Sequence, residues 1–312
     1  MEYPNPKIKF YKVRNLSEKL TIVFEFMREN WKPMLKFSFY LILPLCLFQA
    51  FAMNSMMRYA FTMGFESGSG GTSVPTFSFV LNYGLLMLFI LIGTSIMNAM
   101  TYSLMAEYER RESRLIQLTL NDFKTLLLRN TGKALRAFLL MIGAIVLLSG
   151  IIVLLVFVSP WTLILTGLIA VVGGIAVMVP LSLFMPVYLF EDISFVEALR
   201  KSFKYGFSAW GETFLVILIF GFLANIVSSV TMLPWYMLIL FGEIFSLTES
   251  GAGINNAIWY QFITYLLGII QSYGMYVSYF LSAVGIAFQY FHIREKNEGI
   301  SVDASIQNFE RL

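Results

Sequence analysis

Six long apolar stretches alternate with charged segments along the chain. Each stretch is long enough to cross a bilayer as a helix, because a span needs about 20 apolar residues. None contains an Asp, Glu, Lys or Arg except Lys36, which lies near the start of the first stretch and can extend its side chain to the interface. The pattern predicts an all-α polytopic membrane protein. Its spans are residues 34–57, 77–102, 137–158, 161–190, 213–241 and 259–291.

Three charged segments, which precede the first, third and fifth spans, carry apolar residues at helical spacing. The third begins with Ser194 and Glu197, in the S-x-x-E order of a capping box. We expect three amphipathic helices that lie in the membrane interface. Their apolar positions are Leu16, Leu20, Val23, Phe24, Met27 and Trp31; Leu115, Leu118, Phe123, Leu126 and Leu127; and Phe195, Leu199, Phe203 and Phe207.

The distribution of Lys and Arg predicts the orientation. With six spans, 21 of these residues fall on one side of the membrane and one, Arg58, falls on the other. Loops rich in Lys and Arg stay in the cytoplasm, so both termini are expected there. The domains expected are a cytoplasmic N-terminal segment (1–33), a six-helix membrane domain (34–292) and a cytoplasmic tail (293–312).

The composition of the chain argues against a soluble protein and against some kinds of functional site. The chain is 58% hydrophobic and 13% charged, whereas soluble domains average about 45–50% and about 25%. One cysteine, Cys46, and one histidine, His292, do not supply the three or four ligands of a zinc site. His292 is expected to be an interfacial side chain at the end of the last span, and we expect no enzymatic activity, metal or cofactor. The span centres hold no ionisable residue, which disfavours ion-coupled transport.

Amides inside the spans allow two interpretations. Asn82, Asn98, Asn225 and Gln271 are candidates either for interhelical hydrogen bonds, at roughly 0.6–2 kcal/mol each, or for the lining of a polar cavity. Small residues in the last span, at Gly274, Ser278 and Ser282, recur every four positions. Such a row lets another helix approach closely, either within the chain or from another subunit.

Three short motifs carry a family resemblance. They are residues 185–192 (MPVYLFED), 198–202 (ALRKS) and 291–299 (FHIREKNEG). Their placement resembles that in a group of bacterial six-helix membrane proteins related to the membrane domain of glycerophosphoryl diester phosphodiesterases. The resemblance implies the six-span fold and a bacterial inner-membrane location. It implies no phosphodiesterase activity, because that chemistry belongs to a separate soluble domain.

The same motifs supply a candidate cytoplasmic interaction face. If the last helix continues, Arg294 and Glu298 are neighbours at i and i+4, and Glu295 is a candidate partner of Arg200. We expect a non-enzymatic scaffold or accessory subunit that binds anionic lipids or a protein partner, and no nucleic acid. The alternative is a transporter or lipid-handling permease component with a polar intramembrane cavity. The residues of the face are Arg200, Lys201, Lys204, Arg294, Glu295 and Glu298.

The topology is testable with single cysteines in a Cys46→Ala background. Ser69→Cys should react with a membrane-impermeant thiol reagent added to intact cells, because its loop carries few basic residues and is expected outside. Ser113→Cys should react only after the cells are opened. Labelling of Ser113→Cys in intact cells would contradict the six-span topology.

Overall fold

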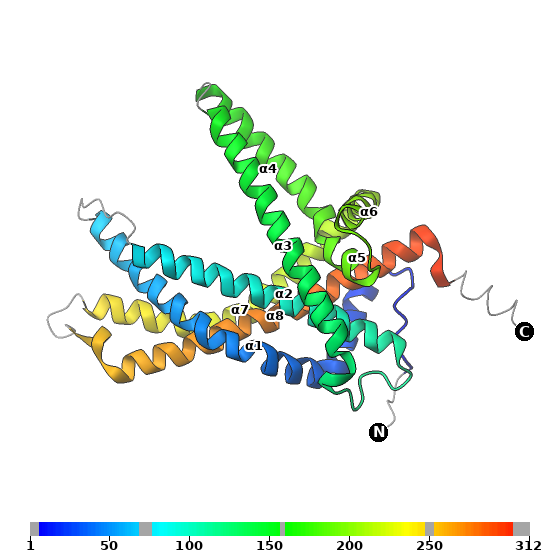
Figure 1. Ribbon diagram of the computed structural model, residues 1–312, viewed down its shortest axis with the longest axis horizontal. Helices are drawn as coiled ribbons and strands as arrows, with labels where there is room; N and C mark the ends of the chain where they lie inside the picture. The colour runs from blue at the N-terminus through cyan, green and yellow to red at the C-terminus, as the bar shows by residue number, and fades with distance from the viewer. Residues whose placement is uncertain (1–5, 69–76, 157–159, 247–252, 302–312) are drawn as a thin grey trace, which may run out of the picture. The chain divides into compact units, whose positions relative to one another are not determined.

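The computed structural model in Figure 1 describes residues 6–68, 77–156, 160–246 and 253–301, and these residues contain helices and no strand. The last residues of the third predicted span and most of the predicted tail lie outside the described residues. The helices are α1 Leu16–Gly68, α2 Phe77–Arg110, α3 Leu120–Val156, α4 Pro160–Ser182, α5 Phe184–Phe190, α6 Phe195–Ser208, α7 Trp210–Ser246, the 3-10 turn η2 Ile254–Asn256 and α8 Ile258–Glu298.

Six helices in the described part of the chain are long and apolar enough to cross a membrane. They overlap all six predicted stretches, so the prediction of an all-α polytopic membrane protein is confirmed. Several are longer than a bilayer requires. The 53 residues of α1 correspond to about 80 Å of helix, compared with a hydrocarbon core of about 30 Å. At least part of the first two charged segments therefore extends the apolar helices.

These extensions correct the prediction of three separate amphipathic helices. The first predicted segment is the start of α1 and runs into the first span without a break. Part of the second forms turns before α3 begins at Leu120, and the rest is continuous with the third span. Only α6 is a separate helix, and the backbone N–H of Glu197 donates to the Ser194 side chain at its N-terminus, as expected. Pro33 lies between the first segment and its span, and Gly132 lies between the second segment and its span, yet α1 and α3 continue through them.

The chain divides into two compact units. Unit 1 contains Met1–Met34, Asn98–Gly221 and Leu281–Leu312, and unit 2 contains Leu35–Met97 and Phe222–Phe280. Helices α3 to α6 belong to unit 1 alone, whereas α1, α2, α7 and α8 each contribute residues to both units.

Unit 2 is held together by helix packing and hydrogen bonds between helices. The Tyr276 hydroxyl of α8 donates to Gln49 Oε1 of α1 over 2.6 Å, and the Trp235 indole of α7 donates to Asn54 Oδ1 of α1 over 2.7 Å. These amide partners satisfy groups that are costly to leave unpaired in lipid. The amides of the first span therefore form hydrogen bonds between helices.

The fourth predicted span is broken in two. Pro180 lies in the last turn of α4, and Leu183 N–H donates to the Pro180 carbonyl in a tighter turn before α5 begins at Phe184. Pro186 is tolerated in the first turn of α5, because its missing N–H has no partner within the helix there. The break places Glu191 and Asp192 directly after α5, beside α6.

Gly206 allows α6 to approach α4 closely in unit 1. A Cβ added at Gly206 would lie 2.3 Å from the Pro180 Cα, and a Cβ added at Gly211 would meet nothing within 4 Å. We therefore predict that Gly206→Ala lowers the free energy of unfolding by about 1–3 kcal/mol, the usual cost of overpacking. The control, Gly211→Ala, should be neutral or stabilising by up to about 1 kcal/mol. Thermal unfolding in detergent measures both, and equal stability of the two variants would contradict this packing.

Candidate functional site: a charged network in unit 1

Glu191 is the centre of a first ionic cluster in unit 1. Its side chain is 5% exposed and accepts hydrogen bonds from Lys201 Nζ of α6 at 2.7 Å and from the Tyr290 hydroxyl of α8 at 3.0 Å. Arg294 Nε of α8 lies 3.9 Å from the same carboxylate. The hydrogen bond to Glu191 raises the pKa of Lys201. One carboxylate at the end of α5 thus links α6 and α8.

A second carboxylate, Glu298, binds the same two helices. Arg294 Nε donates to Glu298 over 2.9 Å, which confirms that the last helix continues far enough for this predicted pair. The Tyr205 hydroxyl of α6 also donates to Glu298. Burial, together with this hydrogen bond, raises the pKa of Tyr205, so its hydroxyl keeps the proton that it donates. We call Glu191, Lys201, Tyr205, Tyr290, Arg294 and Glu298 the Glu191 cluster.

Asp192 connects this region to α3. Its backbone is in the left-handed region, with φ of 55°, and its carboxylate accepts from Arg129 at 3.0 Å and from Lys133. The hydrogen bond from Lys133 holds the pKa of Asp192 below its ordinary value. The consecutive acids Glu191 and Asp192 therefore point to different helices and join α3, α5, α6 and α8.

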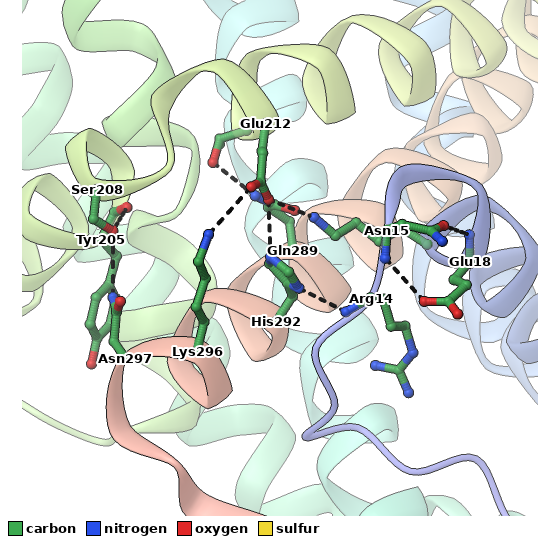
Figure 2. Close-up of polar contacts among 12 residues, drawn as sticks. Arg14, Asn15, Glu18, Tyr205, Ser208, Glu212, Gln289, His292, Lys296 and Asn297 are labelled. Carbon is green, nitrogen blue, oxygen red and sulfur yellow. Dashed lines mark hydrogen bonds and ion pairs between the residues drawn. The ribbon is translucent and has the colours of Figure 1, made fainter.

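His292 lies in a second cluster, shown in Figure 2. Its ring is buried, and its Nε2 lies 3.0 Å from Glu212 Oε2 of α7. Lys19 of α1 and Lys296 of α8 approach the same carboxylate at 3.1 and 3.5 Å. The backbone N–H of Arg14 donates to His292 Nδ1 over 3.0 Å. The histidine that was expected at the membrane interface is buried within the protein and hydrogen-bonded on both nitrogens.

Two further sets of ion pairs lie in the same unit. Glu107 binds Arg110 and Arg111 near the end of α2. Arg114, in the turn that follows, is buried and binds Glu29 of α1 over 2.9 Å. Together with the clusters above, they form what we call the charged network.

The predicted interaction face divides between this network and the surface. Lys201, Arg294 and Glu298 belong to the Glu191 cluster, whereas Arg200 and Lys204 are exposed and in none of the ion pairs within the described residues. The suggested Glu295–Arg200 pair is wrong. Glu295 is buried and accepts hydrogen bonds from the backbone and hydroxyl of Ser301.

Gly274 of the small-residue row packs against α7 of the same chain. A Cβ at Gly274 would lie 2.2 Å from Thr231 Oγ1 of α7 within unit 2. The buried Ser278 donates to the Met275 carbonyl of its own helix, and Ser282 is half-buried. The row therefore allows close packing on α7 at Gly274.

The predicted cavity amides lie in different surroundings. Asn82 donates to the Ser78 carbonyl of its own helix, and Asn225 is exposed. Asn98 is buried in unit 1. Gln271 is buried in unit 2, and its Oε1 has no hydrogen-bond partner among the described residues. The polar-cavity hypothesis stays a prediction.

A groove of about 440 Å³ was not predicted from the sequence. It lies between residues 6–14 and the first turns of α1, and Lys7, Lys9, Lys12, Glu18 and Glu25 contribute to its lining. The alternation of basic and apolar residues in 7–14 was its only sequence signal. No group of acidic, histidine and cysteine side chains within the described residues is arranged to hold a metal ion.

The Glu191 cluster generates a stability prediction. Glu191→Gln should lower the free energy of unfolding by about 1.5–3 kcal/mol, because hydrogen bonds to charged groups contribute about that much. The control is Glu197→Gln, an exposed change on α6 that should stay within about 0.5 kcal/mol of the parent. Thermal unfolding in detergent compares them. Equal unfolding temperatures for the two variants would show that the cluster contributes nothing to stability.

Comparison with known proteins leaves the resemblance untested. No family model matches the chain, and no curated protein or solved structure matches it. The relation to the phosphodiesterase-associated membrane proteins stays a prediction that rests on the three motifs alone.

Proposed function

We propose that the protein is a non-enzymatic scaffold or accessory subunit of the bacterial inner membrane, which acts through a basic cytoplasmic face. The observation that supports it most is the division of charge in unit 1. The buried and half-buried carboxylates are used in hydrogen bonds within the protein, whereas many basic side chains at the surface lack a carboxylate partner.

Exposed basic residues without an ion pair outnumber exposed acidic ones. Within the described residues on the proposed cytoplasmic side, nine are basic and five are acidic. The basic ones are Lys9, Lys12, Arg28, Lys32, Lys36, Lys124, Arg136, Arg200 and Lys204. The acidic ones are Glu18, Glu25, Glu109, Glu112 and Glu197. The surplus is therefore positive.

A positive surface beside a membrane attracts negative groups. Each basic residue near an anionic leaflet contributes about 1 kcal/mol to binding. Paired residues such as Lys19 and Lys201 already bind Glu212 and Glu191, so they are less available to other anionic groups. The exposed set is the part of the charge that is available to anionic lipids or to a partner with an acidic surface.

The orientation is part of the proposal. The distribution of 21 basic residues against one supports a cytoplasmic location for both termini. The charged network and the exposed basic set then lie on the same cytoplasmic side.

A second proposal, a lipid-handling permease component, is supported by one observation in unit 2. The buried polar atoms Gln271 Oε1 and Ser272 Oγ, adjacent on α8, have no hydrogen-bond partner among the described residues. Unpaired polar atoms in a membrane interior favour a bound polar group. The accessory role ranks first because its support comes from many side chains.

The test reverses the charge of two exposed residues that lie outside the charged network. Arg200→Glu combined with Lys204→Glu leaves Lys201 bound to Glu191, so the fold should persist. Enrichment of anionic over zwitterionic lipid, measured by mass spectrometry of the protein in mixed-lipid nanodiscs, should fall by about fivefold for each basic residue removed. Cross-linking in cells reports whether a protein partner is lost as well.

The matched control is Glu112→Lys combined with Glu197→Lys, which changes exposed acidic residues in the opposite direction and should raise the enrichment. If the Arg200 and Lys204 variant unfolds at the parent's temperature and loses neither lipid enrichment nor any cross-link, the proposed face is wrong. In that event a loss of lipid binding in Gln271→Leu would favour the permease.

A further inference from the structure

Residues 6–15 form a non-helical N-terminal segment within unit 1. Phe10 is 3% exposed, and its ring lies 4.9 Å from Phe291 and 5.6 Å from Tyr108, centroid to centroid. The backbone N–H of Ile8 donates to the Tyr108 hydroxyl over 3.2 Å. The segment is therefore fixed by a buried aromatic side chain and by hydrogen bonds to α2 and α8.

Its last contact before α1 begins is with His292. The Arg14 backbone N–H donates to Nδ1 over 3.0 Å, so Nδ1 must hold a lone pair. The ring proton is then on Nε2, which donates it to Glu212 over 3.0 Å. The hydrogen-bond network thus assigns a neutral ring with the proton on Nε2.

The groups around this ring disfavour a second proton but do not prevent it. Lys19 of α1 and Lys296 of α8 share the Glu212 carboxylate of α7 with His292. The Arg14 guanidinium donates to the carbonyls of Phe10, Lys12 and Lys9 in its own segment. One carboxylate therefore faces two ammonium groups, and a charged imidazole would add a third cation.

We propose that the N-terminal segment is a strap held by the neutral form of His292, and that a proton on Nδ1 releases it. A proton there would place two N–H donors against each other, at the distance of a hydrogen bond, with no acceptor between them. Arg14 and Nδ1 must then separate, and the repulsion from Lys19 and Lys296 favours the separation. The strap does not depend on the proposed accessory role, because it concerns only the state of the segment.

Release would expose a surface of the segment that is now packed against the protein. The segment contains Lys7, Lys9 and Lys12 alternating with Ile8, Phe10 and Tyr11. Once Phe10 leaves its pocket, the segment is basic and apolar at once, a combination that binds anionic membrane surfaces. The groove between the segment and α1 would open in the same step.

A spin label near the contact measures the release. Val13→Cys, exposed beside Arg14, carries a nitroxide in a Cys46→Ala background. The mobile fraction of its spectrum should rise severalfold between about pH 8 and about pH 5, with a midpoint below the ordinary histidine pKa of about 6.5, because burial and the two ammonium groups disfavour the charged ring. An unchanged spectrum across this range would overturn the proposal.

The control separates His292 from the carboxylates. In His292→Asn, the side-chain Oδ1 takes the approximate place of Nδ1 and accepts from Arg14 without titrating. The label should then stay immobile at both pH values. The same increase in mobility as in the parent would assign the release to another group and overturn the proposal.

A second measurement needs no variant at this position. The chain has a single histidine, so the nitrogen NMR spectrum of histidine-labelled protein without an affinity tag reports His292 alone. At neutral pH it should show Nδ1 unprotonated and Nε2 protonated, and its protonation midpoint should coincide with that of the spin label. A proton on Nδ1 at neutral pH, or release while the ring stays neutral, would refute the strap.

Discussion

Carboxylates that bind side chains from several helices at once are the interaction on which unit 1 depends. Glu191 contacts Lys201, Tyr290 and Arg294, and Glu212 contacts Lys19, His292 and Lys296. Charges at the ends of membrane helices lie close to an apolar phase, where an unpaired charge is costly. Sharing one carboxylate among groups from different helices satisfies that constraint and fixes how α1, α5, α6, α7 and α8 meet.

The spans could be predicted because each needs only a local property, about 20 apolar residues in a row. The continuity of α1 could not, since Pro33 lies between the amphipathic segment and the first span and favours a break there, whereas the helix continues through it. The break between α4 and α5 had a signal in Pro180 and Pro186, but their sequence positions do not say whether a helix bends or ends.

The candidate site was predictable in its residues and not in its pairings. Arg294 and Glu298 were paired correctly because their contact is within one helix turn. Glu295 was assigned to Arg200 and instead binds Ser301, and the burial of His292 between Arg14 and Glu212 was not predicted. Both outcomes depend on packing between segments that are far apart in the sequence. The pattern of charges along the chain does not specify which segments pack together. The same packing decides which basic residues remain exposed, and the proposed function rests on that set.

Lysine reactivity in native membranes tests this division of charge most directly. Lys9, Lys12, Lys124 and Lys204 are exposed without an ion pair, whereas Lys19 is 4% exposed at its side chain and bound to Glu212. If anionic groups cover the basic face, an amine reagent should modify the first four severalfold more slowly in native membranes than in detergent, and Lys19 slowly in both. Equal rates for the four lysines in membranes and in detergent would contradict the account.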